Sequence, residues 1–248
     1  MVYWQTLWLA TRNQLLHPKS ALLTFFFSTL NTLTLYVLWL LLFDRFPRIG
    51  RADLSDISFL FGMATAVVGL TTYLCGGIFE LPYLIRTRNL DLLLLNPKRV
   101  LTCLLPRQSL LGGVATALSS IVFFAVSEYV SWSDIPFIVL CIANGLIVFT
   151  SVILWTSSIT FWLPSGSEIS RYFEQFMMTF LLFSETWFSK PVRLLLYTLI
   201  PVGLISYWPL SIIKEPSLKQ MALITVASGG FFLVSLLIFS LGLRRYGR

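Results

Sequence analysis

The sequence predicts an all-α integral membrane protein with six transmembrane helices preceded by an interfacial helix. Hydrophobic residues make up 56% of the 248 residues and charged residues only 12%, whereas a soluble domain carries about 25% charged residues. The mean hydropathy of +0.81 also excludes an ordinary water-soluble globule. Six helices of about 20 residues use roughly half of the chain and leave too little for a separate soluble domain. We therefore expect a single polytopic membrane domain over residues 1–248.

The first two predicted elements are an interfacial helix and a span. Residues 2–16 have one apolar and one polar face, contain two tryptophans and are too polar to cross a bilayer. This pattern is typical of a helix that lies in the membrane interface. An uncharged run at 20–43 follows, between Lys19 and Asp44. It is long enough to cross about 30 Å of hydrocarbon and is the first predicted span.

Four more spans follow from later apolar runs. We expect the second at 57–82, the third at 109–128, the fourth at 135–163 and the last at 221–243. The loop 84–108 between the second and third spans combines several basic residues with a stripe of leucines. This loop is therefore predicted to lie along the membrane surface rather than to cross the bilayer.

Two segments compete for the remaining span. Residues 172–189 are marginally long enough but contain two glutamates, whereas residues 194–213 are apolar but broken by Pro201 and Pro209. The positive-inside rule mildly favours the second segment, because more basic residues then lie in the cytoplasm. The two prolines count against it, since each removes a backbone hydrogen bond that lipid cannot replace. Both versions give six spans with cytoplasmic N- and C-termini.

The chain lacks the residue patterns of an enzyme or a metal site. It has no GxxxxGK[ST] phosphate loop, no HExxH pair and no GxSxG nucleophile elbow. The three cysteines are scattered and His17 is the only histidine, so no metal site and no disulfide framework are indicated. The net charge of +7 comes from basic residues in short loops, which indicates membrane topology rather than binding to nucleic acid.

Glutamates near or within the spans are the candidate residues of a substrate path. An ionised group at mid-bilayer costs about 2.5 to 3.5 kcal/mol, so it usually faces protein or water. Glu80, Glu174 and Glu185 are therefore candidates, and Trp187 beside Glu185 adds an aromatic face suited to an organic cation. The alternative is that Glu80, Glu174 and also Glu128 lie at helix ends among the lipid headgroups. Intramembrane carboxylates also fit an ion-coupled secondary transporter or channel.

The basic loop has two interpretations. A short amphipathic helix fixed to two spans transmits movement from a soluble partner into the membrane. The alternative is that its charges only set the topology and contact anionic lipids.

The loop sequence resembles a known family. The run IRTRNLDLLLLNP, residues 85–97, is similar to the cytoplasmic loop of bacterial ABC transporter permeases of the type-2 export class, in the daunorubicin or multidrug exporter-like branch. Arg88 stands where that branch commonly has glycine. The residues that match are Leu90, Asp91, Leu94, Leu95 and Pro97 in the loop, and Phe161, Trp162, Pro191, Leu194, Leu195, Leu196, Pro201, Tyr207 and Pro209 nearer the C-terminus.

The resemblance implies further features of the fold. It implies a cytoplasmic coupling helix within the loop, with Arg86, Arg88, Asp91 and Pro97 as the residues that meet an ATPase. It also implies a re-entrant outer-leaflet segment at 191–214 before the last span, marked by Pro201, Tyr207 and Pro209. That segment favours 172–189 as the fifth span and places Glu185 near an outer gate.

The resemblance also implies a function and a set of partners. It implies a permease subunit of an exporter in the bacterial inner membrane, surrounded by membrane lipids. The aromatic and carboxylate residues of 172–189 suggest that the exported substrate is a small amphipathic or cationic organic compound. No cofactor is expected in this chain, because ATP and Mg²⁺ bind to two copies of a separate ABC ATPase. A second six-span permease, identical or different, completes the transporter.

Overall fold

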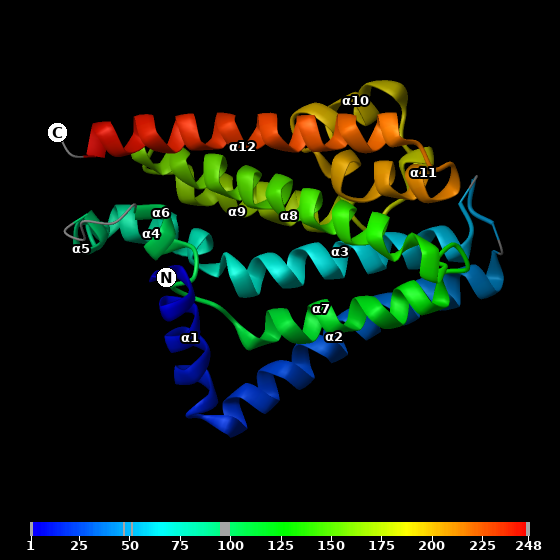
Figure 1. The fold of residues 1–248 in the computed structure, drawn as a ribbon, viewed down its shortest axis with the longest axis horizontal. Coiled ribbons are helices and arrows are strands. Elements are labelled where there is room, and N and C mark those ends of the chain that lie inside the picture. Colours follow the sequence, from blue (N-terminus) through cyan, green and yellow to red (C-terminus); the bar gives the residue numbers. More distant parts are fainter. Residues whose placement is uncertain (1, 47, 51, 95–99, 247–248) are drawn as a thin grey trace.

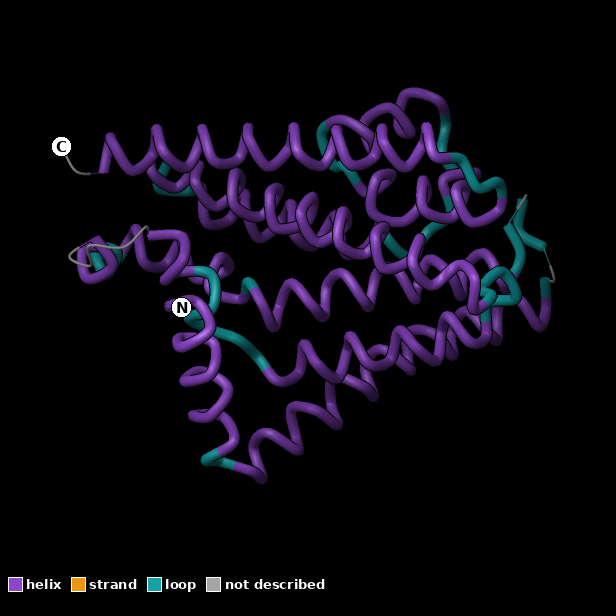
Figure 2. Tube along the Cα trace, viewed as in Figure 1, coloured by secondary structure: helices purple, strands orange, loops and turns teal. Residues whose placement is uncertain are grey.

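The structure is a computed structural model that describes residues 2–46, 48–50, 52–94 and 100–246. Every regular element within these residues is a helix (Figure 2). Four helices are long and apolar enough to cross a membrane, namely α2 (Pro18–Arg45), α3 (Leu54–Leu74), α8 (Ile135–Ser158) and α12 (Leu218–Tyr246). The all-α membrane class is confirmed, and the count of six spans stays a prediction.

The long helices run side by side and α3 lies among them (Figure 1). Most side chains of α3 are buried, and its most extensive packing is against α7 (Leu111–Val126), a shorter apolar helix at the third predicted span. Gly69 of α3 and Gly113 of α7 allow this close approach, because a Cβ on Gly113 would lie 2.6 Å from the Gly69 carbonyl oxygen. Small residues at helix contacts are a typical means of packing in membranes.

The second predicted span, 57–82, is not one continuous α-helix. Helix α3 ends at Leu74, and the chain continues as a 3₁₀ helix over Gly76–Glu80 and then as α4 (Leu81–Arg86). Gly77 explains the break, because it donates a backbone hydrogen bond of 3.0 Å to Leu105 and lies against the Leu104 carbonyl, where a Cβ would not fit. The long-range contact with the loop therefore overrides helix continuation.

The fifth predicted span, 172–189, also has other boundaries. Helix α9 runs over Gly166–Phe180, and Tyr207 donates a hydrogen bond of 2.7 Å to the Phe180 carbonyl at its end. After α9 the chain makes a 3₁₀ turn at Glu185–Trp187, so Glu185 and Trp187 lie in a turn and not in a spanning helix.

The competing segment, 194–213, is not one straight span either. It consists of α10 (Lys190–Thr198), a π-helical turn (Gly203–Tyr207) and α11 (Trp208–Lys214), and the two halves meet at an angle of 87°. Pro201 lies at the bend, where its missing N–H favours a break in the helix. Both α10 and α11 lie in the half of the molecule away from the basic loop (Figure 1).

The two ends of the molecule differ in what they carry. Helices α1 (Val2–Leu15), α4, α5 (Asp91–Leu94) and α6 (Val100–Leu104) gather at one end with the C-terminal end of α12 (Figure 1). The connection between α2 and α3 lies at the opposite end. Helix α1 runs at a steep angle to the long helices (Figure 1). Its residues correspond to the predicted interfacial helix 2–16.

Candidate functional site

The basic loop is a compact turn between short helices. After α4 the chain reverses at Arg88, whose φ is +57°, and Leu90 donates a backbone hydrogen bond of 3.2 Å to Leu84. A left-handed backbone is unfavourable for a residue with a Cβ and natural for glycine. This backbone geometry explains why a glycine suits the position at which this chain has Arg88.

Buried leucines attach the loop to the helix bundle. Leu90 and Leu104 are fully buried and Leu93 is nearly so, all within the main hydrophobic core. Arg86, Arg88 and Asp91, three of the predicted coupling residues, lie exposed on the same loop, while Pro97 falls outside the described residues. The loop therefore presents a charged surface from a base that is packed into the core.

The C-terminal end of α12 lies at the same end of the molecule as this loop (Figure 1). The ring of Tyr246, the last residue of α12, packs 5.9 Å from the ring of Phe161, which follows α8. The last spanning helix is therefore packed against the end of α8 close to the loop.

Helix α1 holds both ends of the chain segment that contains the loop. Tyr3 donates a hydrogen bond of 2.7 Å to the carbonyl of Leu74, the last residue of α3. Gln14 accepts a hydrogen bond of 2.9 Å from the backbone N–H of Leu111 and donates one to the Ser109 carbonyl, at the start of α7. These bonds satisfy backbone groups that helix ends leave unpaired. Sequence reasoning missed this role, because the partners lie 71 to 97 residues away.

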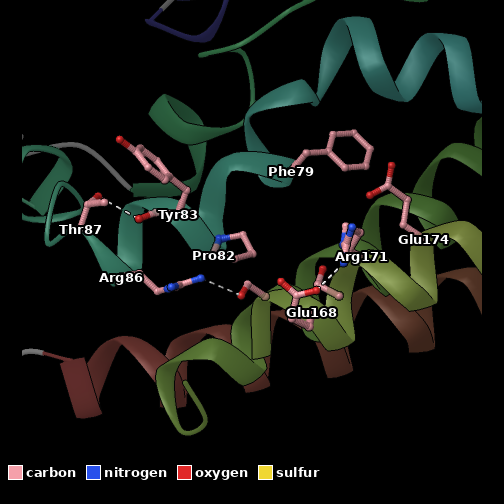
Figure 3. A pocket seen from close by; sticks show the side chains of 10 residues that line it. Phe79, Pro82, Tyr83, Arg86, Thr87, Glu168, Arg171 and Glu174 are labelled. Atoms are coloured by element: carbon pink, nitrogen blue, oxygen red, sulfur yellow. Dashed lines mark hydrogen bonds and ion pairs between the residues drawn. The ribbon is translucent and has the colours of Figure 1, made fainter. Parts of the chain in front are cut away.

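A groove of about 560 Å³ lies between α4 and α9 beside the loop. Arg86 donates a hydrogen bond of 3.3 Å to Ser167 across it, and Glu168 pairs with Arg171 on its α9 side. Figure 3 shows Thr87 at one end of the groove and Phe79 and Glu174 at the other. The lining residues are Phe79, Pro82, Tyr83, Arg86, Thr87, Ser167, Glu168, Ser170, Arg171 and Glu174.

The three glutamates predicted for a substrate path do not lie together. Glu174 lines the groove beside the loop, while Glu80 lies 3.8 Å from Arg107 in a partly exposed ion pair. Glu185 lies near the opposite end of the molecule and accepts a hydrogen bond of 2.7 Å from Tyr197. Each glutamate therefore has its own surroundings, and Glu174 is the one that lines the groove together with Arg86 and Thr87 of the basic loop.

Trp187 ties the turn after α9 to the opposite end of the molecule. Its indole N–H donates a hydrogen bond of 2.8 Å to the Ile49 carbonyl, and its ring stacks on Trp39 with centroids 5.5 Å apart. Glu185 and Trp187 thus help to anchor the turn between α9 and α10 in the described structure.

An ion pair that sequence reasoning missed closes this same end. Lys214, the last residue of α11, donates a hydrogen bond to Asp56, whose side chain is 6% exposed. The Lys214 ammonium also lies 4.6 Å from the centre of the Tyr129 ring, and burial, together with the nearby charge of Asp56, raises the pKa of the Tyr129 phenol. Asp53 and Asp56 form a capping box at the start of α3. That spacing is visible in the sequence, but the partner Lys214 is not.

Comparison with known proteins identifies the family. A family model described as ABC-2 family transporter protein matches residues 29–248. The chain belongs to the ABC-2 transporter family. This membership confirms an ABC-2 type permease, which is a multi-pass membrane subunit. The ATPase activity of such a transporter belongs to a separate partner subunit. Searches of curated proteins and of solved structures gave no match.

Family membership also supplies a soluble partner. An ABC-2 permease associates with ABC ATPase subunits. The interpretation of the chain as an ion-coupled transporter or channel is therefore set aside.

Proposed function

We propose that this permease couples ATP hydrolysis by its partner ATPase to the export of a small amphipathic or cationic organic compound. The observation that carries the proposal is the basic loop. Its charged residues Arg86, Arg88 and Asp91 are exposed, while its leucines are buried in the core. The surface meets the ATPase, and the buried base passes the resulting force to the spanning helices. Pro97, which lies outside the described residues, stays a candidate for the same coupling role.

Three routes lead from the loop into the membrane. Helix α4 follows α3 through the 3₁₀ helix, and α6 leads toward α7. The C-terminal end of α12 lies at the same end of the molecule as the loop. Helix α1 is bonded to the ends of α3 and α7 and keeps their spacing constant. Closure of two ATPase subunits, which hold ATP and Mg²⁺, therefore displaces several spans together.

The groove beside the loop is the proposed start of the substrate path. It combines the carboxylate of Glu174 with the aromatic ring of Phe79, a pairing that suits an organic cation with an apolar body. The proposed outer gate is the re-entrant segment at 191–214, supported by its 87° bend and by its position away from the loop. Glu185 lies at the base of this segment, in hydrogen-bond contact with Tyr197.

The proposed assembly contains two ATPase subunits and two permeases in the bacterial inner membrane. The termini and the basic loop face the cytoplasm, where the ATPase is, and the gate faces outward. The position of the loop and both described chain ends at one end of the molecule supports this orientation.

Charge reversal in the loop tests the coupling role. We expect Arg86→Glu combined with Asp91→Arg to abolish co-purification of the ATPase or its substrate-stimulated activity, because the complementary charges on the partner then repel the loop. Arg48→Glu is the matched control, since Arg48 is an exposed arginine in the connection at the opposite end. Unchanged co-purification together with unchanged stimulation in the loop variant would show that the coupling assignment is wrong.

A further inference from the structure

One polar side chain in the middle of a spanning helix has no hydrogen-bond partner among the described residues. Asn31 lies midway along the 28 residues of α2 and is exposed. Its side-chain amide makes no hydrogen bond within the part of the chain that the structure describes. Thr34, one turn further along α2, differs because its hydroxyl is satisfied: it donates a hydrogen bond of 2.8 Å to the Leu30 carbonyl.

An unpaired amide at this depth is costly. The hydrocarbon core contains no water to hydrogen-bond with it, so polar side chains in spans face protein or a watery cavity. The other exposed side chains of α2 are mostly apolar and suit contact with lipid. The side of α2 that carries Asn31 is therefore expected to contact protein rather than lipid.

The residues around Asn31 have the spacing of a helix-packing seam. Positions three and four residues apart lie on one side of a helix, and a heptad seam uses this alternation. The exposed residues that follow it define the Asn31 face, which consists of Phe27, Asn31, Thr34 and Leu38. A single asparagine at such a seam specifies the register and the number of associating helices.

We infer that the Asn31 face is the contact between two copies of this permease, a conclusion that rests on the proposed pairing of permeases. Two copies inserted in the same orientation are related by a two-fold axis along the membrane normal, so residues meet others at the same depth. An amide both donates and accepts, and Asn31 of one copy is therefore complementary to Asn31 of the other. The exposed residues of the face surround that pair with apolar contacts.

Cysteine cross-linking in native membranes tests the contact. In a variant with Cys75, Cys103 and Cys141 replaced by alanine, Asn31→Cys is treated with copper phenanthroline and, separately, with a short bis-maleimide. We expect a product of twice the permease mass. Leu33→Cys is the matched control, because Leu33 is also exposed but lies about 200° around the helix. It should give at least fivefold less product.

The outcomes separate this inference from the proposed function. Absence of any product with both reagents, or equal product from Leu33→Cys, overturns the inference. A product that joins the permease to a different membrane chain also overturns it and indicates a heterodimer. The ABC assignment is judged independently, by co-purification of the ATPase with the same variants.

A second measurement does not depend on cysteine geometry. We expect Asn31→Leu to weaken self-association in bilayers about 3- to 30-fold, the range given by hydrogen bonds between membrane helices. Asn31→Gln keeps an amide and should retain most of the affinity. Because Asn31 is exposed in the single chain, neither change removes a contact inside the fold. Unchanged association of Asn31→Leu, measured by energy transfer at increasing lipid dilution, would contradict the inference.

Discussion

At the scale of single residues, the turn of the basic loop depends on the left-handed backbone of Arg88. This conformation brings Leu90 back to the Leu84 carbonyl and directs Asp91 into α5. A side chain with a Cβ costs about 1 to 2 kcal/mol in such a conformation. The turn persists because the leucines on both sides of it are buried.

Replacement of Arg88 by glycine should therefore stabilise the isolated permease. We expect a gain of up to about 1 kcal/mol, the relieved strain less the greater chain entropy of an unfolded glycine, seen as a higher Tm in detergent. The control is Arg86→Gly in α4, where the backbone is helical and glycine should lower the Tm. A fall in Tm for both variants would show that Arg88 is not strained.

At the scale of elements, the opposite end of the molecule is closed by a pair that joins α3 to α11. Asp56 starts α3 and is almost fully buried, while Lys214 ends α11 and is partly exposed. The capping box of α3 holds the carboxylate in place, and Tyr129 from the turn after α7 covers the ammonium. Three elements distant in sequence meet at this one charge pair.

Removal of the lysine should loosen the re-entrant segment. We expect Lys214→Met to destabilise the protein by about 1 to 3 kcal/mol, because it leaves the buried Asp56 carboxylate without its charged partner. Adding Asp56→Asn should cost less than the sum of the two single changes. Lys219→Met, at an exposed lysine near the start of α12, is the control and should have little effect. Strictly additive losses in a double-mutant cycle would exclude a direct interaction.

At the scale of the whole molecule, the proposed mechanism assigns different roles to the two ends. The end with α1, the basic loop and the end of α12 carries the exposed charges proposed to meet an ATPase. The opposite end carries the bent α10–α11 segment, Glu185 and the Asp56–Lys214 pair. The buried α3 connects the two ends, and in the proposed mechanism it carries movement from one to the other.

Labelling of intact cells checks the orientation of these ends. In the cysteine-free background, Ser133→Cys in the turn before α8 should react with a membrane-impermeant maleimide, because that turn is predicted to face outward. Thr87→Cys in the basic loop should react only after the cells are opened. Both positions are exposed. Reaction of Thr87→Cys in intact cells would reverse the proposed orientation.

Local patterns in the sequence were enough for the membrane class, the family and most of the long helices. Uncharged runs bounded by charged residues located α2, α8 and α12, since the cost of a charge in lipid acts on each segment separately. The loop residues that resemble the ABC-2 permeases are contiguous, and for that reason they were recognisable.

Contacts between distant residues decided the rest. Helix α3 stops at Leu74 because Gly77 packs against the loop, and neither version of the fifth span is one continuous helix. The bonds of Gln14 and the pairing of Lys214 with Asp56 join residues 95 to 158 positions apart. No local hydropathy or charge pattern encodes such pairs, because their energy exists only after the helices have packed together.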